Sequence, residues 1–263
     1  NNFEKVLIGL SGGIDSALTA TIAVDALGSE NVIGVAMPSK YNSEGSLIDA
    51  GSLAKNLKIE FKTIEIEEIV ENLRNTLTDV VGEELGQTTD ENIQSRVRGN
   101  ILMALSNQTG AMVVSTGNKS EMAVGYSTLY GDLAGGFALL KDLYKTEVYN
   151  LSNFRNTISN VIPQNTIDKE PSAELRPDQY DKDSLPEYDL LDKILHLYIE
   201  EDSSSEKIIS TGIDENIVYD VLSKVDRNEY KRKQVAPGVK LTEKAFGKDR
   251  RMPITNTYIR ERD

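Results

Sequence analysis

The first half of the chain alternates between apolar runs and amphipathic stretches. Runs rich in β-branched residues are typical of strands buried on both faces, and they lie at 5–10, 31–37, 59–66 and 111–116. Between them, stretches with helical spacing lie at 16–27, 46–57 and 92–107. In the last stretch an apolar residue recurs every four positions, as one face of a helix requires: Ile93, Val97, Ile101 and Leu105.

This alternation of strands and helices predicts an α/β fold. Parallel βαβ units would form a doubly wound, Rossmann-like parallel sheet with helices on both faces. Ligands of such folds bind at the carboxyl ends of the strands. We therefore expect the functional site in the loops after Leu10, Met37 and Thr116.

The pattern changes beyond about residue 160. The segment from Pro163 to Pro186 is rich in proline and acidic residues and has little apolar periodicity. It predicts a mobile loop at about 163–186. Helical patterns resume at 190–200 and 217–233. We interpret residues 1–263 as a single domain with this loop and a helical C-terminal extension at about 187–263.

Composition excludes several kinds of site. The chain has 263 residues and no cysteine, which excludes disulfides, thiolate metal sites and cysteine nucleophiles. The single histidine, His196, lies in an amphipathic stretch typical of a structural or surface helix, so a structural zinc site is not expected. A metal here would be held by carboxylates, which suits Mg²⁺.

The formal net charge of −13 disfavours binding to nucleic acid and to anionic membrane surfaces. No apolar run approaches the roughly 20 residues of a membrane-spanning helix. Nothing in the sequence resembles a signal peptide. We therefore expect a cytoplasmic protein that binds neither nucleic acid nor membrane.

The stretch SGGIDS at 11–16 follows the first predicted strand and opens the first predicted helix. Successive N–H groups and the positive end of the helix dipole form an anion cradle at such a junction. Glycine suits it because glycine allows close backbone approach to phosphate and a positive φ. The spacing matches neither a Walker A loop nor GxGxxG. The alternative is a tight turn in which Asp15 or Ser16 caps the helix.

Asp15 places a negative charge inside this anion cradle. A carboxylate beside a phosphate is repelled unless a cation lies between them. We therefore hypothesise that Asp15 holds Mg²⁺ against a polyphosphate, which favours nucleotide chemistry over simple phosphate binding.

Several stretches together resemble a known family. The SGGIDS loop is similar to the pyrophosphatase loop of the N-type ATP pyrophosphatases, which by itself leaves GMP synthetase and other members open. The stretches ENIQSRVRGN, STGNKSEMAVGYSTLYGD, PSAELRPDQ, RNEYKRKQVAPGVKLT and FGKDRRMPITN resemble NAD synthetase, and most of all the synthetase part of the bacterial glutamine-dependent form. This resemblance covers nearly the whole chain in order. It implies an adenine nucleotide alpha hydrolase-like fold.

The resemblance also implies roles for individual residues. The pyrophosphate of ATP would lie against Ser11, Gly12, Gly13 and Ser16, with further ATP contacts from Thr116, Lys145 and Ser172. Asp15 and Glu121 would bind Mg²⁺, and the catalytic residues would be Asp15 and Lys145. The substrate pocket would include Arg96, Asn118, Lys119 and Asp132. Ammonia-dependent relatives often have His and Ala where this chain has Asn118 and Lys119.

Taken without the resemblance, several of these residues have ordinary interpretations. Lys145 would be a helix-surface lysine, Glu121 a solvent-exposed carboxylate and Asp132 a turn residue. Arg96 and Arg98 are about 200° apart on a helix, so they cannot both face one ligand. We expect Arg96 to be the one that contacts substrate. The basic runs EYKRKQ and KDRR are either solvated or a local source of positive potential.

The activity implied by the resemblance is the ATP-dependent amidation of deamido-NAD to NAD. The nicotinate carboxylate would be adenylylated with release of pyrophosphate, and ammonia would then displace AMP. Without a cysteine, this chain would use free ammonia. Its start at Asn1 favours the synthetase part of a larger enzyme with a glutaminase domain or partner, while a stand-alone enzyme remains open. The family implies a homodimer.

Two other functions compete with this one. A non-catalytic adenine-nucleotide sensor would keep the anion cradle, but it has no need of the carboxylate pair Asp15 and Glu121. Another ATP pyrophosphatase, such as GMP synthetase, would share the loop but lacks support from the C-terminal stretches. Pyrophosphate release separates the sensor from the enzymes, and substrate choice separates the enzymes from each other.

Overall fold

A five-stranded parallel sheet lies at the centre of residues 2–255, the part of the chain that the computed structural model describes. The strands are β1 Val6–Gly9, β2 Val32–Ala36, β3 Glu60–Thr63, β4 Met112–Ser115 and β5 Phe137–Ala138. Their order is β3-β2-β1-β4-β5, and each neighbouring pair is parallel. Val6 pairs with both Val32 of β2 and Met112 of β4. The strand order reverses between β1 and β4, which is where a doubly wound sheet binds its ligand.

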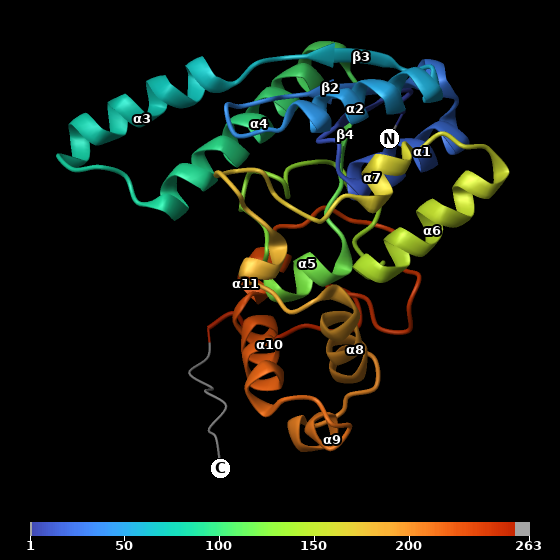
Figure 1. The fold of residues 1–263 in the computed structure, drawn as a ribbon, viewed down its shortest axis with the longest axis vertical. Coiled ribbons are helices and arrows are strands. Elements are labelled where there is room, and N and C mark those ends of the chain that lie inside the picture. Colours follow the sequence, from blue (N-terminus) through green and yellow to red (C-terminus); the bar gives the residue numbers. More distant parts are fainter. Residues whose placement is uncertain (1, 256–263) are drawn as a thin grey trace.

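Helices cover both faces of the sheet (Figure 1). One face is covered by α1 Ile14–Leu27, α2 Glu44–Leu57, α6 Lys145–Ile158 and α7 Gln164–Asp168, and the other by α3 Glu67–Val81 and α4 Gln87–Thr109. Successive strand residues point to opposite faces. Ile8 therefore packs in the core beneath α1, whereas Leu7 packs in the core beneath α4. Both side chains are fully buried, which is worth about 1.5–3 kcal/mol each.

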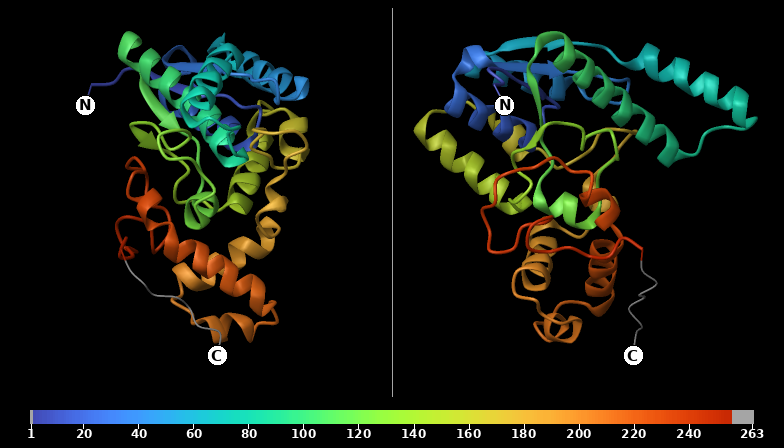
Figure 2. Two further views of the ribbon diagram at one scale, coloured as in Figure 1. Left: turned by 90° about the vertical axis from the view of Figure 1, so that its left-hand side faces the viewer. Right: turned by 180° about the vertical axis from the view of Figure 1, so that it is seen from behind.

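A second group of helices lies beside the carboxyl edge of the sheet (Figures 1 and 2). These helices are α5 Lys119–Val124, α8 Tyr188–Ile199, α9 Ser205–Ile209, α10 Glu215–Arg227 and α11 Glu229–Arg232. Ala123 of α5, Leu195 of α8 and Val221 of α10 belong to one buried core. Because α5 follows directly from the loop after β4, this core reaches the functional edge of the sheet.

The α/β class, the parallel sheet and the two-sided helical cover are confirmed. Helix α3 and the short strand β5 were not expected. The segment 163–186 is not structureless, because it contains α7 and a 3₁₀ turn at Asp181–Asp183, while another 3₁₀ turn lies at Ser29–Asn31. Its mobility stays a prediction, as does the single-domain interpretation.

The C-terminal extension is helical over only part of its length. Among the described residues its helices end at Arg232, and residues 233–255 contain no further helix. The last residues of the predicted extension, 256–263, lie outside the described part of the chain. Within residues 2–255 no helix is both long enough and apolar enough to cross a membrane.

Candidate functional site

A cavity of about 530 Å³ lies at the carboxyl ends of the strands. Its lining includes Leu10, Met37 and Thr116, which begin the loops after β1, β2 and β4. The cavity therefore lies where the strand pattern predicted a ligand site. Segments 125–132 and 166–181 complete its walls.

The β1–α1 loop has the geometry of an anion cradle. Gly12 has φ +82°, and a Cβ added there would lie 2.3 Å from the backbone oxygen of Ser46. Glycine is therefore required both by conformation and by close approach. The N-cap of α1 is Gly13, and it makes no side-chain cap hydrogen bond. The alternative in which Asp15 or Ser16 caps the helix is thus wrong.

Ser16 instead stabilises the loop from within. Its hydroxyl donates to the carbonyl of Gly13 at 2.9 Å and accepts from the amide of Ser11 at 3.3 Å. Ser16 is buried and does not line the cavity, and neither does Gly12. Ser11 and Gly13 do line it. The loop therefore presents only part of the predicted set to a ligand.

Two carboxylates and one ammonium meet in the cavity. Lys145 Nζ forms an ion pair with Asp15 and lies 3.2 Å from Glu121 Oε1. Burial raises the pKa of Glu121, an effect that Lys145 opposes and Asp15 reinforces. Burial alone would lower the pKa of Lys145, but the two carboxylates outweigh it and raise that pKa above its ordinary value. The predicted metal ligands and the predicted catalytic lysine thus form one charge cluster.

Other predicted residues also line the cavity. Thr116 and Ser172 do so, and Ser172 Oγ donates to the carbonyl of Gln179 at 2.5 Å, within the 163–186 segment. The Asp132 carboxylate accepts from the Thr128 amide at 2.6 Å. Burial raises the pKa of Asp132 to about 6. Asp132 therefore lines the cavity with a carboxylate fixed by the Thr128 amide, although the residue keeps substantial exposed surface.

The two arginines of α4 differ in their position relative to the cavity, and not in the way that was expected. Arg96 is exposed, does not line the cavity and donates to the carbonyl of Leu129 at 3.2 Å. Arg98 lines the cavity and donates to the carbonyl of Met37 at 3.0 Å. Burial lowers the pKa of Arg98 to about 10. Only Arg98 therefore reaches this cavity in the described conformation, and a substrate contact by Arg96 stays a prediction.

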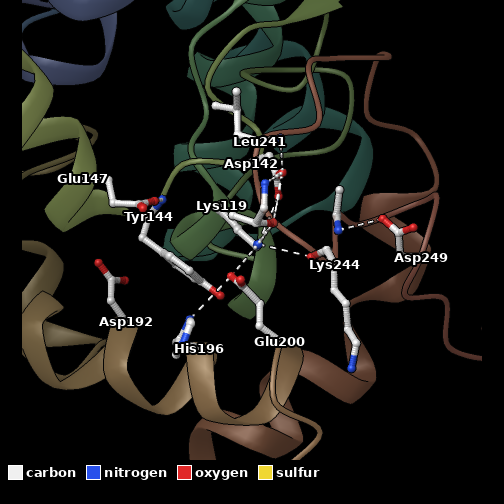
Figure 3. Close-up of polar contacts among 12 residues, drawn as sticks. Lys119, Asp142, Tyr144, Glu147, Asp192, His196, Glu200, Leu241, Lys244 and Asp249 are labelled. Carbon is white, nitrogen blue, oxygen red and sulfur yellow. Dashed lines mark hydrogen bonds and ion pairs between the residues drawn. The ribbon is translucent and has the colours of Figure 1, made fainter.

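Lys119 was expected in the substrate pocket, and the structure buries it elsewhere. Its side chain has no exposed surface and does not line the cavity. Its Nζ lies 3.0 Å from Asp142 Oδ1 and 3.0 Å from Glu200 Oε1, and it donates to Thr242 Oγ1 at 2.7 Å. Figure 3 shows Asp142 and Glu200 pointing toward Lys119, with Lys244 of the C-terminal segment beside it. Lys119 is therefore a structural residue in this conformation.

Asn118 is also absent from the cavity lining. It is fully buried and is the N-cap of α5, where its Oδ1 accepts from the Glu121 amide at 2.9 Å. Its Nδ2 donates to Asp15 Oδ1 at 2.9 Å. In this conformation Asn118 thus contacts the proposed metal ligands and not the cavity, and the expected substrate contact stays a prediction.

Comparison with known proteins places the chain in a family. The family model described as NAD synthase matches residues 1–235. The chain belongs to this family. It is 55% identical to the glutamine-dependent NAD(+) synthetase of Thermotoga maritima over 260 residues, covering 98% of this chain and 45% of that protein. The NAD synthase resemblance drawn from the motifs is confirmed.

Solved structures of NAD synthase relatives agree. A glutamine-dependent NAD+ synthetase from Acinetobacter baumannii, in complex with ADP, is 49% identical with a TM-score of 0.63, covering 96% of this chain and 46% of that one. The NMN synthetase from Francisella tularensis is 29% identical with a TM-score of 0.73, and the match covers 92% of this chain and 90% of that one. This chain spans about half the length of the curated relatives it matches.

Sequence reasoning missed several residues of the NAD synthase cavity. Lys169, Glu174 and Asp181 come from the 163–186 segment, and Lys231 comes from α11. Lys231 donates to the carbonyls of Gly125 and Ser127 at 2.6 and 2.7 Å. The basic run EYKRKQ that contains it was one of the quoted motifs, so the signal was present. The contacts that direct it inward are long-range and were not readable from spacing.

The donor set fits Mg²⁺ shared with a polyphosphate. Among the described residues no group of three or more His, Cys, Asp or Glu could hold a metal ion without other ligands. Asp15 and Glu121 nevertheless supply two carboxylates that converge on one cation, here the ammonium of Lys145. Mg²⁺ is commonly bound by one or two carboxylates together with substrate phosphates and water.

Proposed function

We propose that this chain forms NAD from deamido-NAD, ATP and ammonia. The observation that carries the proposal is the convergence of Asp15 and Glu121 on Lys145 beside the glycine-rich β1–α1 loop. Membership of the NAD synthase family supports it, as does the ADP bound to the Acinetobacter baumannii relative. The alternatives, a nucleotide sensor and GMP synthetase, have no comparable support.

Different cavity residues would contact ATP, pair with its phosphates and bind the metal ion. Ser11, Gly13, Thr116 and Ser172 would contact ATP, with Gly12 and Ser16 shaping the loop behind them. Lys145 would pair with the phosphates of the departing pyrophosphate. Asp15 and Glu121 would hold Mg²⁺, which would neutralise phosphate charge when bound. Asp132 would line the dinucleotide part of the same cavity.

The chemistry joins a carboxylate to ammonia through a good leaving group. A nicotinate carboxylate oxygen would attack the α-phosphorus of ATP, and the bond to pyrophosphate would break. The nitrogen of ammonia would then attack the carboxyl carbon, AMP would leave with its oxygen, and a proton would be lost to solvent. The protein would position the reactants and exclude water, with segment 169–181 covering the cavity.

The nitrogen source and the assembly belong to the same proposal. This chain contains no cysteine, so it would use ammonia directly or receive it from a separate glutaminase domain. We also infer a homodimer. The exposed apolar side chains Leu73, Val80 and Val81 of α3 support a partner surface there. Sedimentation equilibrium of wild type and Val80→Lys tests it, since a monomeric wild type would exclude the dimer.

The test of activity is pyrophosphate release by the purified chain with ATP, Mg²⁺ and deamido-NAD. We expect turnover with ammonium and none with glutamine. Asp15→Asn should abolish turnover because it removes a charged ligand of the Mg²⁺ that would neutralise the phosphates. Nicotinate mononucleotide should be tested as a competing substrate, since a solved relative is an NMN synthetase. Tight ATP binding without turnover on any acid would contradict the proposal and favour the sensor.

A further inference from the structure

The first turn of α5 carries one of the two proposed metal ligands and the residue that contacts the other. Asn118 precedes it as N-cap, and Glu121 lies within it. The opposite ligand, Asp15, lies in the first turn of α1, far away in sequence. The Asn118 side chain joins them: it donates to Asp15 Oδ1 and accepts from the Glu121 amide, each at 2.9 Å. One buried amide thus spans both halves of the charge cluster.

Only an amide satisfies both neighbours at this position. The Glu121 N–H requires an acceptor, and the Asp15 carboxylate requires a donor. A buried aspartate would offer a second carboxylate to Asp15, whereas a serine would keep the cap but be too short to span both groups. Asn118 has no exposed surface, so a dissolved substrate cannot contact it in this conformation.

The Asp15 carboxylate is held from two sides. Asn118 binds Oδ1, and Lys145 pairs with Oδ2. Oδ2 therefore faces the cavity side where Glu121 also contacts Lys145. The first turn of α5 is itself held by a further hydrogen bond, because Ser120 Oγ accepts from the Lys145 amide at 2.9 Å. The turn that carries Asn118 is thus held against the start of α6.

We propose that Asn118 is a positioning residue, which orients Asp15 relative to Glu121 so that the two carboxylates bind one Mg²⁺ together with ATP. This inference rests on the proposed function. Partners that orient a metal ligand from the outer shell typically contribute about 10–100-fold to metal affinity. Asn118 acts through Asp15 and does not touch the reactants.

The test compares Asn118→Ser with Asp214→Ser. Asp214 is the N-cap of α10, where it accepts from the Asn216 amide at 2.9 Å, away from the cavity lining. Serine is a good N-cap, so both variants keep a capping oxygen. Only Asn118→Ser loses the donor to Asp15. The readouts are calorimetric binding of ATP across a Mg²⁺ titration, the Mg²⁺ dependence of turnover, and the KM for deamido-NAD.

For Asn118→Ser we expect about a 10-fold rise in the Mg²⁺ concentration needed for half-maximal ATP binding. Excess Mg²⁺ should restore kcat, and the KM for deamido-NAD should not change. Asp214→Ser should match wild type. An unchanged Mg²⁺ requirement, or a raised KM for deamido-NAD alone, would overturn the inference. If wild type itself binds ATP without any Mg²⁺ dependence, the proposed function fails instead, and the two failures are distinguishable.

Discussion

Gly12 illustrates how single residues set the shape of the phosphate loop. Alanine at this position would meet the backbone oxygen of Ser46 in addition to the strain of φ +82°. The conformational strain alone costs about 1–2 kcal/mol. We therefore expect Gly12→Ala to lower the free energy of unfolding by more than this amount and to weaken ATP binding. Urea unfolding and ATP titration are the measurements.

Gly82 offers a matched control, because its φ is +79° but no atom lies within 4 Å of an added Cβ. Gly82→Ala carries the same conformational strain without the clash. The difference in unfolding free energy between the two variants isolates the steric effect. Equal losses would show that Ser46 moves aside easily and that close approach is not the reason for glycine at position 12.

Asp132 predicts a pH dependence of stability. Burial raises its pKa from 3.8 to about 6, against the hydrogen bond from the Thr128 amide. The folded protein therefore keeps a proton that the unfolded chain releases as pH rises through this range. Wild type should lose stability relative to Asp132→Asn as pH rises from 3.8 to about 6. Urea unfolding across this range measures the difference.

The control for this experiment is Asp178→Asn, at an exposed residue that makes no hydrogen bond or ion pair in the described part of the chain. This variant removes an exposed carboxylate by the same chemical change, so the pH dependence of Asp132→Asn is measured against it. A flat difference for Asp132→Asn would mean that the carboxyl group has the same pKa in the folded and unfolded chains, and the raised pKa would be wrong.

At the scale of elements, periodicity located most of the longer strands and helices. It missed the short strand and the side-chain positions that long-range contacts determine. Strands β1, β2 and β4 follow from apolar runs, since parallel strands buried on both faces need little alternation. β3 was also expected to be buried, but it lies at the edge of the sheet and is mostly exposed. β5 has only Phe137 and Ala138 and pairs with β4 alone, so no run marks it. The loop positions were predictable, but the choice of Arg98 over Arg96 depended on the rotation of α4, which packing fixes.

Segment 163–186 makes contacts that its composition did not predict. The Glu174 carboxylate accepts from Asn42 Nδ2 at 2.8 Å and Ser46 Oγ at 2.6 Å, and pairs with Lys169 at 2.6 Å. These contacts fasten the segment to the start of α2. We expect Glu174→Ala to raise the KM for ATP and to speed proteolysis within 170–180, because hydrogen bonds to a charged group contribute about 1.5–3 kcal/mol.

Asp178→Ala is the control for this prediction. Glu174 and Asp178 have nearly the same positive φ, 50° and 49°, so both variants change the backbone preference alike. Only Glu174→Ala removes contacts to α2. If both variants are cleaved at the same rate and bind ATP equally, the carboxylate contacts do not hold the segment in place.

At the scale of the whole molecule, the Lys119 cluster joins three parts of the fold. Lys119 begins α5, Glu200 follows α8, and Thr242 belongs to the C-terminal segment. Asp142 binds the amides of Leu241 and Thr242, and these bonds with Lys119 hold its pKa below the ordinary value despite burial. No local pattern marks Lys119 as buried, since lysine is usually exposed. Sequence reasoning therefore placed it in the substrate pocket.

Replacing Lys119 with methionine should destabilise the whole molecule. The side chain keeps similar bulk, but Asp142 and Glu200 lose their shared cation, and removing one partner of a buried ion pair typically costs about 3–5 kcal/mol. Lys193→Met is the control, because Lys193 is exposed on α8. Urea unfolding should show a large loss for Lys119→Met only, with the KM for deamido-NAD unchanged in the folded fraction. A stable Lys119→Met variant with a raised KM would instead return Lys119 to the substrate pocket.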